Sequence, residues 1–216
     1  MKRVRRLSET AGVALSPEAE TVLEGYYRLL QTWNARMNLT ALDLDSPGDR
    51  ELERLLIEPM AASGYLPAGT RWVIDVGSGG GSPAIPLRAV LPGGSMTLVE
   101  SRGRKAVFLK EIVRILSLSD TEVVSARSEA VAWSQGREGT ADAVTVRAVR
   151  LNSALVNSIG RLLRPGGSLL LFGSKLTSLP SEAATPKFTL QGHHRLLPSS
   201  EDRLAVFRRD RDLPVG

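Results

Sequence analysis

Asp75-Val76-Gly77-Ser78-Gly79-Gly80-Gly81 is the stretch of this sequence that decides its fold. It ends the short apolar run from Arg71 to Val76, and such a run followed by glycines is typical of a buried strand that enters a turn. Glycine lets the backbone turn tightly and lie close to a ligand, because no Cβ stands in the way. In an open α/β sheet, ligands bind beyond the carboxyl ends of the strands. The stretch therefore predicts a ligand-binding loop at the end of a first strand.

Beyond this loop the sequence alternates between helical and strand-like patterns. Strands alternating with helices imply parallel βαβ units, so the predicted fold class is α/β with a doubly wound, Rossmann-like sheet. Pro165-Gly166-Gly167 is expected to end the last helix, and two final strand-like pieces are expected to add an antiparallel edge. The predicted helices are 83–90, 104–116, 128–133 and 151–163; the strands are 95–100, 122–125, 141–146, 168–172, 187–190 and 203–207; and 178–186 is a loop.

The sequence before residue 67 has a helical pattern. Ser16-Pro17 indicates a helix start, and four apolar residues follow it at helical spacing: Val22, Tyr26, Leu30 and Trp33. A second helix is predicted at 50–62, where Pro59 is expected to kink or shorten it. The basic residues 1–6 are expected to be a solvated tail. We therefore expect an N-terminal helical extension over residues 1–66 and the α/β domain over residues 67–216.

Composition restricts the possible functions. The chain has 216 residues, no cysteine and a formal net charge of +5, so a thiol nucleophile and thiolate metal ligands are excluded. No apolar run approaches the roughly 20 residues needed to span a bilayer, so a soluble cytoplasmic protein without a membrane partner is expected. The basic excess fits a polyanion such as nucleic acid, although many basic proteins bind none. His193 and His194 are expected in a loop, and adjacent histidines alone do not predict a metal.

The spacing of the glycines indicates which ligand the loop takes. A dinucleotide fingerprint needs a third glycine at position 82, which is Ser82, whereas D-x-G-x-G-x-G resembles motif I of S-adenosylmethionine methyltransferases. Glu100 ends the second predicted strand, where an acid can accept hydrogen bonds from ribose hydroxyls. The sequence therefore predicts S-adenosyl-L-methionine as cofactor, with contacts from Asp75, Gly77, Ser78, Gly79, Gly81 and Glu100.

The residues around the loop resemble a narrower family. The stretch from Asp75 to Leu87 is similar to the D-[LV]-G-[ST]-G-x-G-[FL]-P-G-[IL]-P-L element of the RsmG (GidB) family of 16S rRNA (guanine-N7)-methyltransferases. Further matching elements are Trp33-Asn34 with Met37-Asn38-Leu39-Thr40, Leu98 to Leu109, and Arg147-Ala148-Val149, and the resemblance runs from about Leu15 to Phe207. Five positions depart from the usual family pattern: Leu55, Glu58, Pro59, Ser82 and Ala84.

The resemblance implies a function and further site residues. It implies methyl transfer to a guanine N7 of 16S rRNA, with naked rRNA or the small ribosomal subunit as partner. Arg147 is expected to be the catalytic residue, because it lies where cofactor and target are positioned. The resemblance implies four further cofactor contacts: Ser82, Ser128, Glu129 and Arg147. A helix start explains Ser128 and Glu129 equally well. Residues expected to contact the RNA substrate are Lys175, Asn38 and Arg104, with Arg102 and Lys105 beside it.

The chemistry that the residues permit is consistent with this function. Methylation of pyrimidine carbon-5 commonly needs a cysteine, and amine methylation commonly needs an [N/D/S]-P-P-[Y/F/W] loop where this chain has Thr145 to Ala148. Guanine N7 carries a lone pair and no proton, so close placement of the reactants can suffice. Two alternatives remain: a small-molecule methyltransferase on the same fold, and a non-catalytic relative that binds RNA or the ribosome. A monomer without metal is expected.

Overall fold

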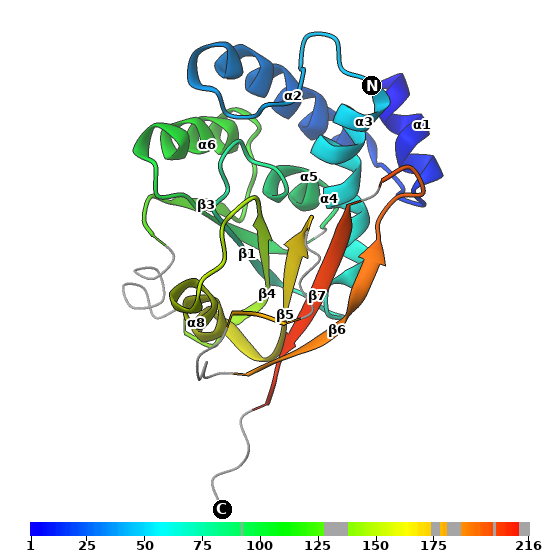
Figure 1. The fold of residues 1–216 in the computed structure, drawn as a ribbon. Coiled ribbons are helices and arrows are strands. Elements are labelled where there is room, and N and C mark those ends of the chain that lie inside the picture. Colours follow the sequence, from blue (N-terminus) through cyan, green and yellow to red (C-terminus); the bar gives the residue numbers. More distant parts are fainter. Residues whose placement is uncertain (92, 128–137, 174–177, 181–186, 201, 212–216) are drawn as a thin grey trace, which may run out of the picture.

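A computed structural model describes residues 1–91, 93–127, 138–173, 178–180, 187–200 and 202–211 (Figure 1). Its centre is a seven-stranded sheet in the order β3-β2-β1-β4-β5-β7-β6. The first five strands run parallel, and β7 and β6 form an antiparallel edge, which confirms the predicted doubly wound sheet. The strands are β1 (Trp72–Val76), β2 (Ser95–Val99), β3 (Thr121–Val124), β4 (Ala141–Arg147), β5 (Leu163–Phe172), β6 (Phe188–Arg195) and β7 (Arg203–Arg209).

Helices cover both faces of this sheet, because each strand sends alternate side chains to opposite sides. Val73 faces a core shared with the helices that precede the sheet and with α5 and α6, whereas its neighbour Ile74 faces a core formed with α8. The residues before position 67 therefore pack directly on the sheet. The helices are α1 (Lys2–Thr10), α2 (Pro17–Met37), α3 (Asp49–Leu52), η1 (Glu53–Ile57), α4 (Glu58–Ala61), η2 (Ala62–Tyr65), α5 (Ala84–Ala89), α6 (Gly103–Ile115) and α8 (Ser153–Leu162).

The long helix α2 begins where its sequence predicts. Ser16 caps it, since the Ser16 hydroxyl oxygen accepts a hydrogen bond from the Ala19 amide at 3.2 Å. Tyr26 and Leu30 are fully buried on the face toward the sheet. Trp33 packs against the Phe108 ring of α6, with ring centroids 5.5 Å apart. The predicted stripe thus joins α2 to the α/β sheet.

Several expectations about local structure were wrong. The first residues form α1 rather than a solvated tail, because Val4 and Leu7 lie three positions apart on one face and are buried. β5 begins at Leu163, so Pro165-Gly166-Gly167 lies within a strand, next to a register shift against β4. His193 and His194 belong to β6 and pair with β7 rather than lying in a loop. The predicted helix 128–133 and most of the predicted loop 178–186 fall outside the described residues.

The predicted helix at 50–62 is a continuous helical segment with a wider turn inside it. A π-helical turn, η1, lies between α3 and α4, and Pro59 is at the second position of α4. π-turns within helices occur frequently at functional sites. None of the helices formed by the described residues combines the length and the apolar character that a membrane crossing requires.

Candidate functional site

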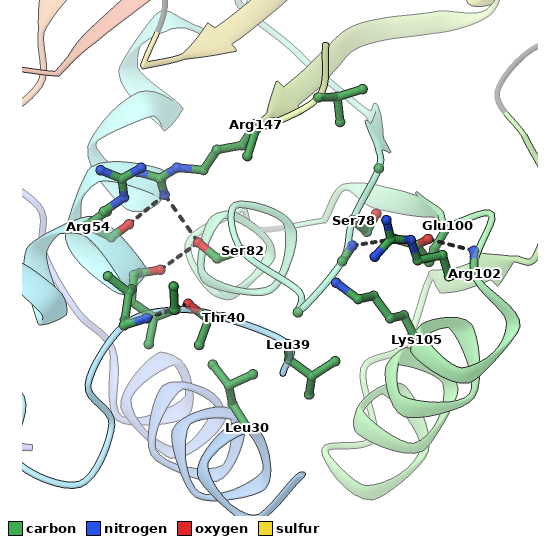
Figure 2. A pocket seen from close by; sticks show the side chains of 18 of the residues that line it. Leu30, Leu39, Thr40, Arg54, Ser78, Ser82, Glu100, Arg102, Lys105 and Arg147 are labelled. Carbon is green, nitrogen blue, oxygen red and sulfur yellow. Dashed lines mark hydrogen bonds between the residues drawn. The ribbon is translucent and has the colours of Figure 1, made fainter. Parts of the chain in front are cut away.

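A cavity of about 690 Å³ opens at the carboxyl ends of β1, β2 and β4. In the sheet, β1 lies between β2 and β4, so strand order reverses there, which is the usual ligand position in such folds. Three loops border the cavity: the glycine loop after β1, the turn that starts at Glu100 after β2, and the residues from Arg147 after β4. Leu39 to Leu42, which follow α2, close another side (Figure 2).

The glycine loop is fixed to the neighbouring strand by backbone hydrogen bonds. The amides of Gly77 and Ser78 both donate to the Val99 carbonyl, at 2.8 and 3.1 Å. Gly77 has φ +76°, and a Cβ there would overlap the Cγ2 atom of Val149. Only glycine fits this conformation and this space without strain, so the loop presents bare backbone to the cavity.

Tyr26 of α2 supports the loop from below. Its hydroxyl donates to the Gly80 carbonyl at 2.8 Å, and the Tyr26 side chain is fully buried. Burial raises the pKa of the Tyr26 phenol, so that it stays a neutral donor. A Cβ on Gly81 would lie 3.1 Å from the Tyr26 ring. Sequence reasoning placed Tyr26 on an apolar stripe and gave no signal for this contact, because its partner is 54 positions away.

Glu100 links the turn after β2 to the glycine loop. Its Oε2 atom accepts from the Gly79 amide at 2.8 Å, and its Oε1 atom accepts from the Arg102 amide at 2.7 Å. Glu100 is 6% exposed and lines the cavity. A carboxylate oxygen can accept two hydrogen bonds, so Glu100 retains acceptor capacity toward a ligand.

Asp75 lies beneath the loop rather than in the cavity wall. It is fully buried, and its Oδ1 atom accepts from the Thr145 hydroxyl at 2.5 Å. Its Oδ2 atom has no hydrogen-bond partner among the described residues. Burial raises the pKa of Asp75 to about 6, against the opposing effect of the Thr145 hydrogen bond. Asp75 therefore supports the glycine loop from behind and does not line the cavity.

Arg147 forms the wall opposite Glu100 and is held by several partners. Its guanidinium donates to the Arg54 carbonyl at 2.6 Å and to the Ser82 hydroxyl at 3.4 Å, and it forms an ion pair with Glu58. The guanidinium also lies 5.3 Å from the centroid of the Phe172 ring. Burial lowers the pKa of Arg147, and the Glu58 charge opposes this effect. Arginine stays charged under such conditions, so Arg147 is a fixed cation.

Glu58 continues this network toward the antiparallel edge of the sheet. It is 3% exposed, and its Oε1 atom accepts from the Ser200 hydroxyl at 2.7 Å. The Ser200 oxygen in turn accepts from the Asp202 amide at 3.1 Å. A buried carboxylate needs both a counter-charge and hydrogen bonds, and Glu58 has both. The sequence marked Glu58 only as a departure from the family pattern, and its contact with Arg147 was missed.

Pro59 explains why two carbonyls of the π-turn are free to accept hydrogen bonds from side chains of the site. Proline has no N–H, so the carbonyls of Arg54 and Leu55, five and four positions earlier, cannot receive a helical hydrogen bond from it. Arg147 donates to the first carbonyl, and the Ser82 hydroxyl donates to the second at 2.8 Å. Two departures from the family pattern, Pro59 and Ser82, thus belong to one arrangement, of which Figure 2 shows Arg54, Ser82 and Arg147.

The structure brings most of the predicted site residues together. Gly77, Ser78, Gly79, Ser82, Glu100 and Arg147 all line the cavity. Asp75 and Gly81 lie behind the lining. Asn38 ends α2 with φ +48°, and Arg104 is exposed on α6; neither is among the described residues that line the cavity. The predicted contacts Ser128, Glu129 and Lys175 lie outside the described residues.

Cations dominate the charge around the cavity. Glu100 is the one carboxylate among the described lining residues. Five cationic residues line the same cavity: Arg54, Arg102, Lys105, Arg147 and Arg150. In the described part of the chain, no group of three or more histidines and acids is arranged to hold a metal ion. The wall is therefore suited to an anionic ligand or substrate.

A family profile decides the relationship. Residues 19–201 match the family described as GidB, rRNA small subunit methyltransferase G. The chain belongs to this family. Relatives from three bacteria are each named Ribosomal RNA small subunit methyltransferase G. The Stenotrophomonas maltophilia protein is 39% identical over 162 residues, which are 74% of this chain and 71% of the relative. The Halorhodospira halophila protein is 37% identical over 75% of this chain and 73% of its own length, and the Xanthomonas campestris protein is 40% identical over 67% and 64%.

Solved structures agree with the fold of this GidB chain. A crystal structure of MtNAS in complex with MTA and tNA superposes with a TM-score of 0.55 at 14% identity, over 88% of this chain and 70% of that one. The putative methyltransferase yhhF from Escherichia coli gives a TM-score of 0.51 at 12% identity, over 65% and 76%. At such identities these likenesses support the Rossmann-like methyltransferase fold alone.

Proposed function

We propose that this chain transfers the methyl group of S-adenosyl-L-methionine to a guanine N7 of 16S rRNA, as a monomer in the cytoplasm. One observation carries the proposal: the bare backbone of the glycine loop meets Glu100 at the cavity, through the 2.8 Å hydrogen bond from the Gly79 amide. Membership of the GidB family supports the substrate. The naked rRNA and the assembled small subunit are both candidate forms of it.

The residues present fit the cofactor. Gly77 lines the cavity with φ +76° and packs against the Val149 side chain, so bare backbone faces the ligand space at this position. In the proposal, Gly77, Ser78 and Gly79 contact the cofactor, and Glu100 accepts from its ribose hydroxyls. Ser82 borders the same space, while Asp75 and Gly81 shape the loop from behind. When bound, the cofactor supplies an electrophilic methyl group on a sulfonium.

The protein's own part in the reaction is placement and exclusion of water. Guanine N7 loses no proton when it is methylated, so no general base is required, and two well-positioned reactants suffice. We assign Arg147 to hold the target side of the cavity, because its guanidinium is fixed by Glu58 and by the Arg54 carbonyl.

Cations around the opening are proposed to hold the RNA backbone. Arg102 and Lys105 lie on one side of the cavity, and Arg54 and Arg150 belong to its lining as well. Arginine binds phosphate through two parallel hydrogen bonds, and lysine binds it as a point charge. Asn38, Arg104 and Lys175 remain proposed substrate contacts. This distribution of charge favours RNA over a small neutral substrate.

A deletion strain tests the proposal. Mass mapping of 16S rRNA from a strain without this gene is expected to lack one 7-methylguanosine. The wild-type gene restores it, and Gly77→Asp and Arg147→Ala do not. Gly69→Ala serves as control, because Gly69 has φ +73° with open space around it, far from the cavity. An unchanged modification map defeats the rRNA assignment.

Two measurements separate the alternatives. The first is calorimetry with S-adenosylmethionine. If the protein binds RNA but not this cofactor, it is a non-catalytic relative. Cofactor binding without any salt-dependent affinity for RNA identifies a small-molecule methyltransferase, since neutralisation of phosphates makes RNA affinity fall steeply with salt.

A further inference from the structure

A second hollow lies at the opposite end of the sheet from the cavity. Its volume is about 570 Å³, and it is formed where β5 begins, where β7 ends and where the chain approaches β1. In Figure 1 this is the lower end, where β7 runs toward the C-terminus. The residues that line it are Pro67, Ala68, Arg164, Pro165, Gly166, Thr189, Gln191, Arg208, Arg209, Asp210 and Arg211. We call it the arginine groove.

The charge of the arginine groove is strongly positive. Four of its described lining residues are arginines, and Asp210 is the one acid among them. The Oδ1 atom of Asp210 accepts from the Thr189 hydroxyl at 2.7 Å, so a neutral partner occupies that oxygen. Like charges gathered on one surface repel one another unless an anion offsets them. The groove thus has the charge expected of an anion-binding surface.

Two of the arginines are fixed and two are available. Arg164 pairs with Asp142 at 2.6 Å, and Arg209 donates to the Leu163 carbonyl. Arg208 and Arg211 are exposed, and neither has an ion pair with any residue that the structure describes. Arg208 follows the buried residues Leu204 to Phe207 of β7 and lies where the strand leaves the core. Nothing in the packing of β7 requires arginine at these two positions.

We propose that the arginine groove binds phosphates of the substrate RNA, as a second contact remote from the cavity. The inference rests on the proposed function. The guanidinium fork matches the geometry of a phosphate, and the Thr189 and Gln191 side chains add polar groups beside it. Phosphate contacts fix the orientation of a protein on its nucleic acid and carry no sequence information. The groove therefore orients the enzyme, while the cavity selects the base.

The test compares two pairs of substitutions with equal loss of charge. RNA affinity is measured over a range of salt concentrations, with naked 16S rRNA and with small ribosomal subunits that lack the modification. Arg208→Ala/Arg211→Ala is expected to weaken RNA binding about tenfold and to reduce the salt slope by about 1 to 2, since each phosphate contact contributes about 0.9. Arg28→Ala/Lys110→Ala is the control, because both residues are exposed and outside both hollows. Arg208→Lys/Arg211→Lys is expected to keep part of the affinity.

Three results overturn the proposal. In the first, the alanine pair in the groove binds RNA as the wild type does. In the second, the control pair loses as much affinity, so net charge alone matters. In the third, the affinity of the alanine pair falls by the same factor at every salt concentration, so the two arginines do not neutralise phosphates. Failure of the proposed function gives a different result. If the wild-type protein binds RNA but methylates none, the proposed function is wrong. The groove is still an RNA contact if the alanine pair weakens that binding.

Discussion

The two walls of the cavity are held together in different ways. On the Glu100 side, backbone amides of the glycine loop donate to strand β2 and to the Glu100 carboxylate. On the Arg147 side, charged side chains from distant segments meet: Glu58 is 89 positions from Arg147 and Arg54 is 93. Backbone hydrogen bonds tolerate many side chains, whereas a buried ion pair fails when one partner is lost. The first wall is therefore sensitive to added volume and the second to lost charge.

Loss of the Glu58 charge is the strongest way to break the second wall. Glu58→Gln is expected to destabilise the protein by about 3 kcal/mol, because it leaves the Arg147 cation buried without a counter-charge. The ion pair between Arg54 and Asp202 is the matched control, since its side chains are 45% and 39% exposed. Asp202→Asn is expected to cost less than about 1 kcal/mol. Denaturant unfolding measures both values, and equal losses contradict the distinction between the two walls.

Added volume at Gly77 breaks the first wall. Gly77→Ala is expected to weaken the binding of S-adenosylmethionine at least about 100-fold in calorimetry, because φ +76° is unfavourable for alanine and the methyl group would overlap Val149. Gly69→Ala has nearly the same φ, +73°, in open space. This control carries the backbone strain without the overlap and is expected to bind the cofactor normally. Normal affinity in Gly77→Ala rejects the assignment of this wall to the cofactor.

The pH dependence of stability tests Asp75, the buried carboxyl behind the glycine loop of the first wall. The pKa of Asp75 is raised from 3.8 to about 6, so the folded protein keeps a proton that the unfolded chain releases. Its contribution to stability is full below pH 3.8 and is lost as the pH rises toward 6. This shift corresponds to about 3 kcal/mol, at about 1.4 kcal/mol for each pKa unit.

Asp75→Asn tests this dependence, because an amide does not titrate. The free energy of unfolding of the variant, relative to the wild type, is expected to increase by up to about 3 kcal/mol between pH 4 and pH 7. Glu9→Gln is the control, since Glu9 lies exposed on α1. A constant difference between Asp75→Asn and the wild type over this range shows that the buried carboxyl has its ordinary pKa.

The coupling between Pro59 and Ser82 is expected to give the smallest change in stability. It tests how the side chains of the second wall depend on one another. Ser82→Ala removes the donor to the Leu55 carbonyl. It is expected to cost about 1 kcal/mol in the natural chain and much less in a Pro59→Ser background, where residue 59 has an N–H to donate. The double-mutant cycle is measured by unfolding. The Ser95 hydroxyl, which donates to the Arg71 carbonyl at 3.2 Å, provides the uncoupled control pair with Pro59.

The difference between the walls also explains what the sequence could reveal. The strands and the glycine loop follow from local patterns. The alternation of strand and helix patterns and the run of glycines are both visible in short stretches of sequence. The parallel sheet, its antiparallel edge and the lining role of Glu100 were all predicted in this way. Glu58, Tyr26 and Ser200 were missed, since each contacts a site residue far away in the sequence. Buried pairing between distant residues leaves no periodic signal.

Local patterns also misled at particular places. Pro165-Gly166-Gly167 has the composition of a turn, yet it lies within β5. Leu163 pairs with Ala141 of β4, so the strand begins before this segment. The basic start was expected to be solvated, yet Val4 and Leu7 bury one side of α1. In both cases tertiary contacts outweighed the composition of a short segment.

The hydrogen bond from Tyr26 to Gly80 has a consequence for how the enzyme matures. During synthesis, α2 emerges from the ribosome well before the residues that Tyr26 will hold, so its phenol has no native acceptor until the chain has grown by 54 residues. The hydrogen bond that supports the cofactor loop therefore forms only when α2 has docked onto the sheet, whose strands all follow α2 in the sequence. The cavity also needs Arg147 and Arg150, so the site for the methyl donor is complete only after β4 and the residues that follow it have been synthesised.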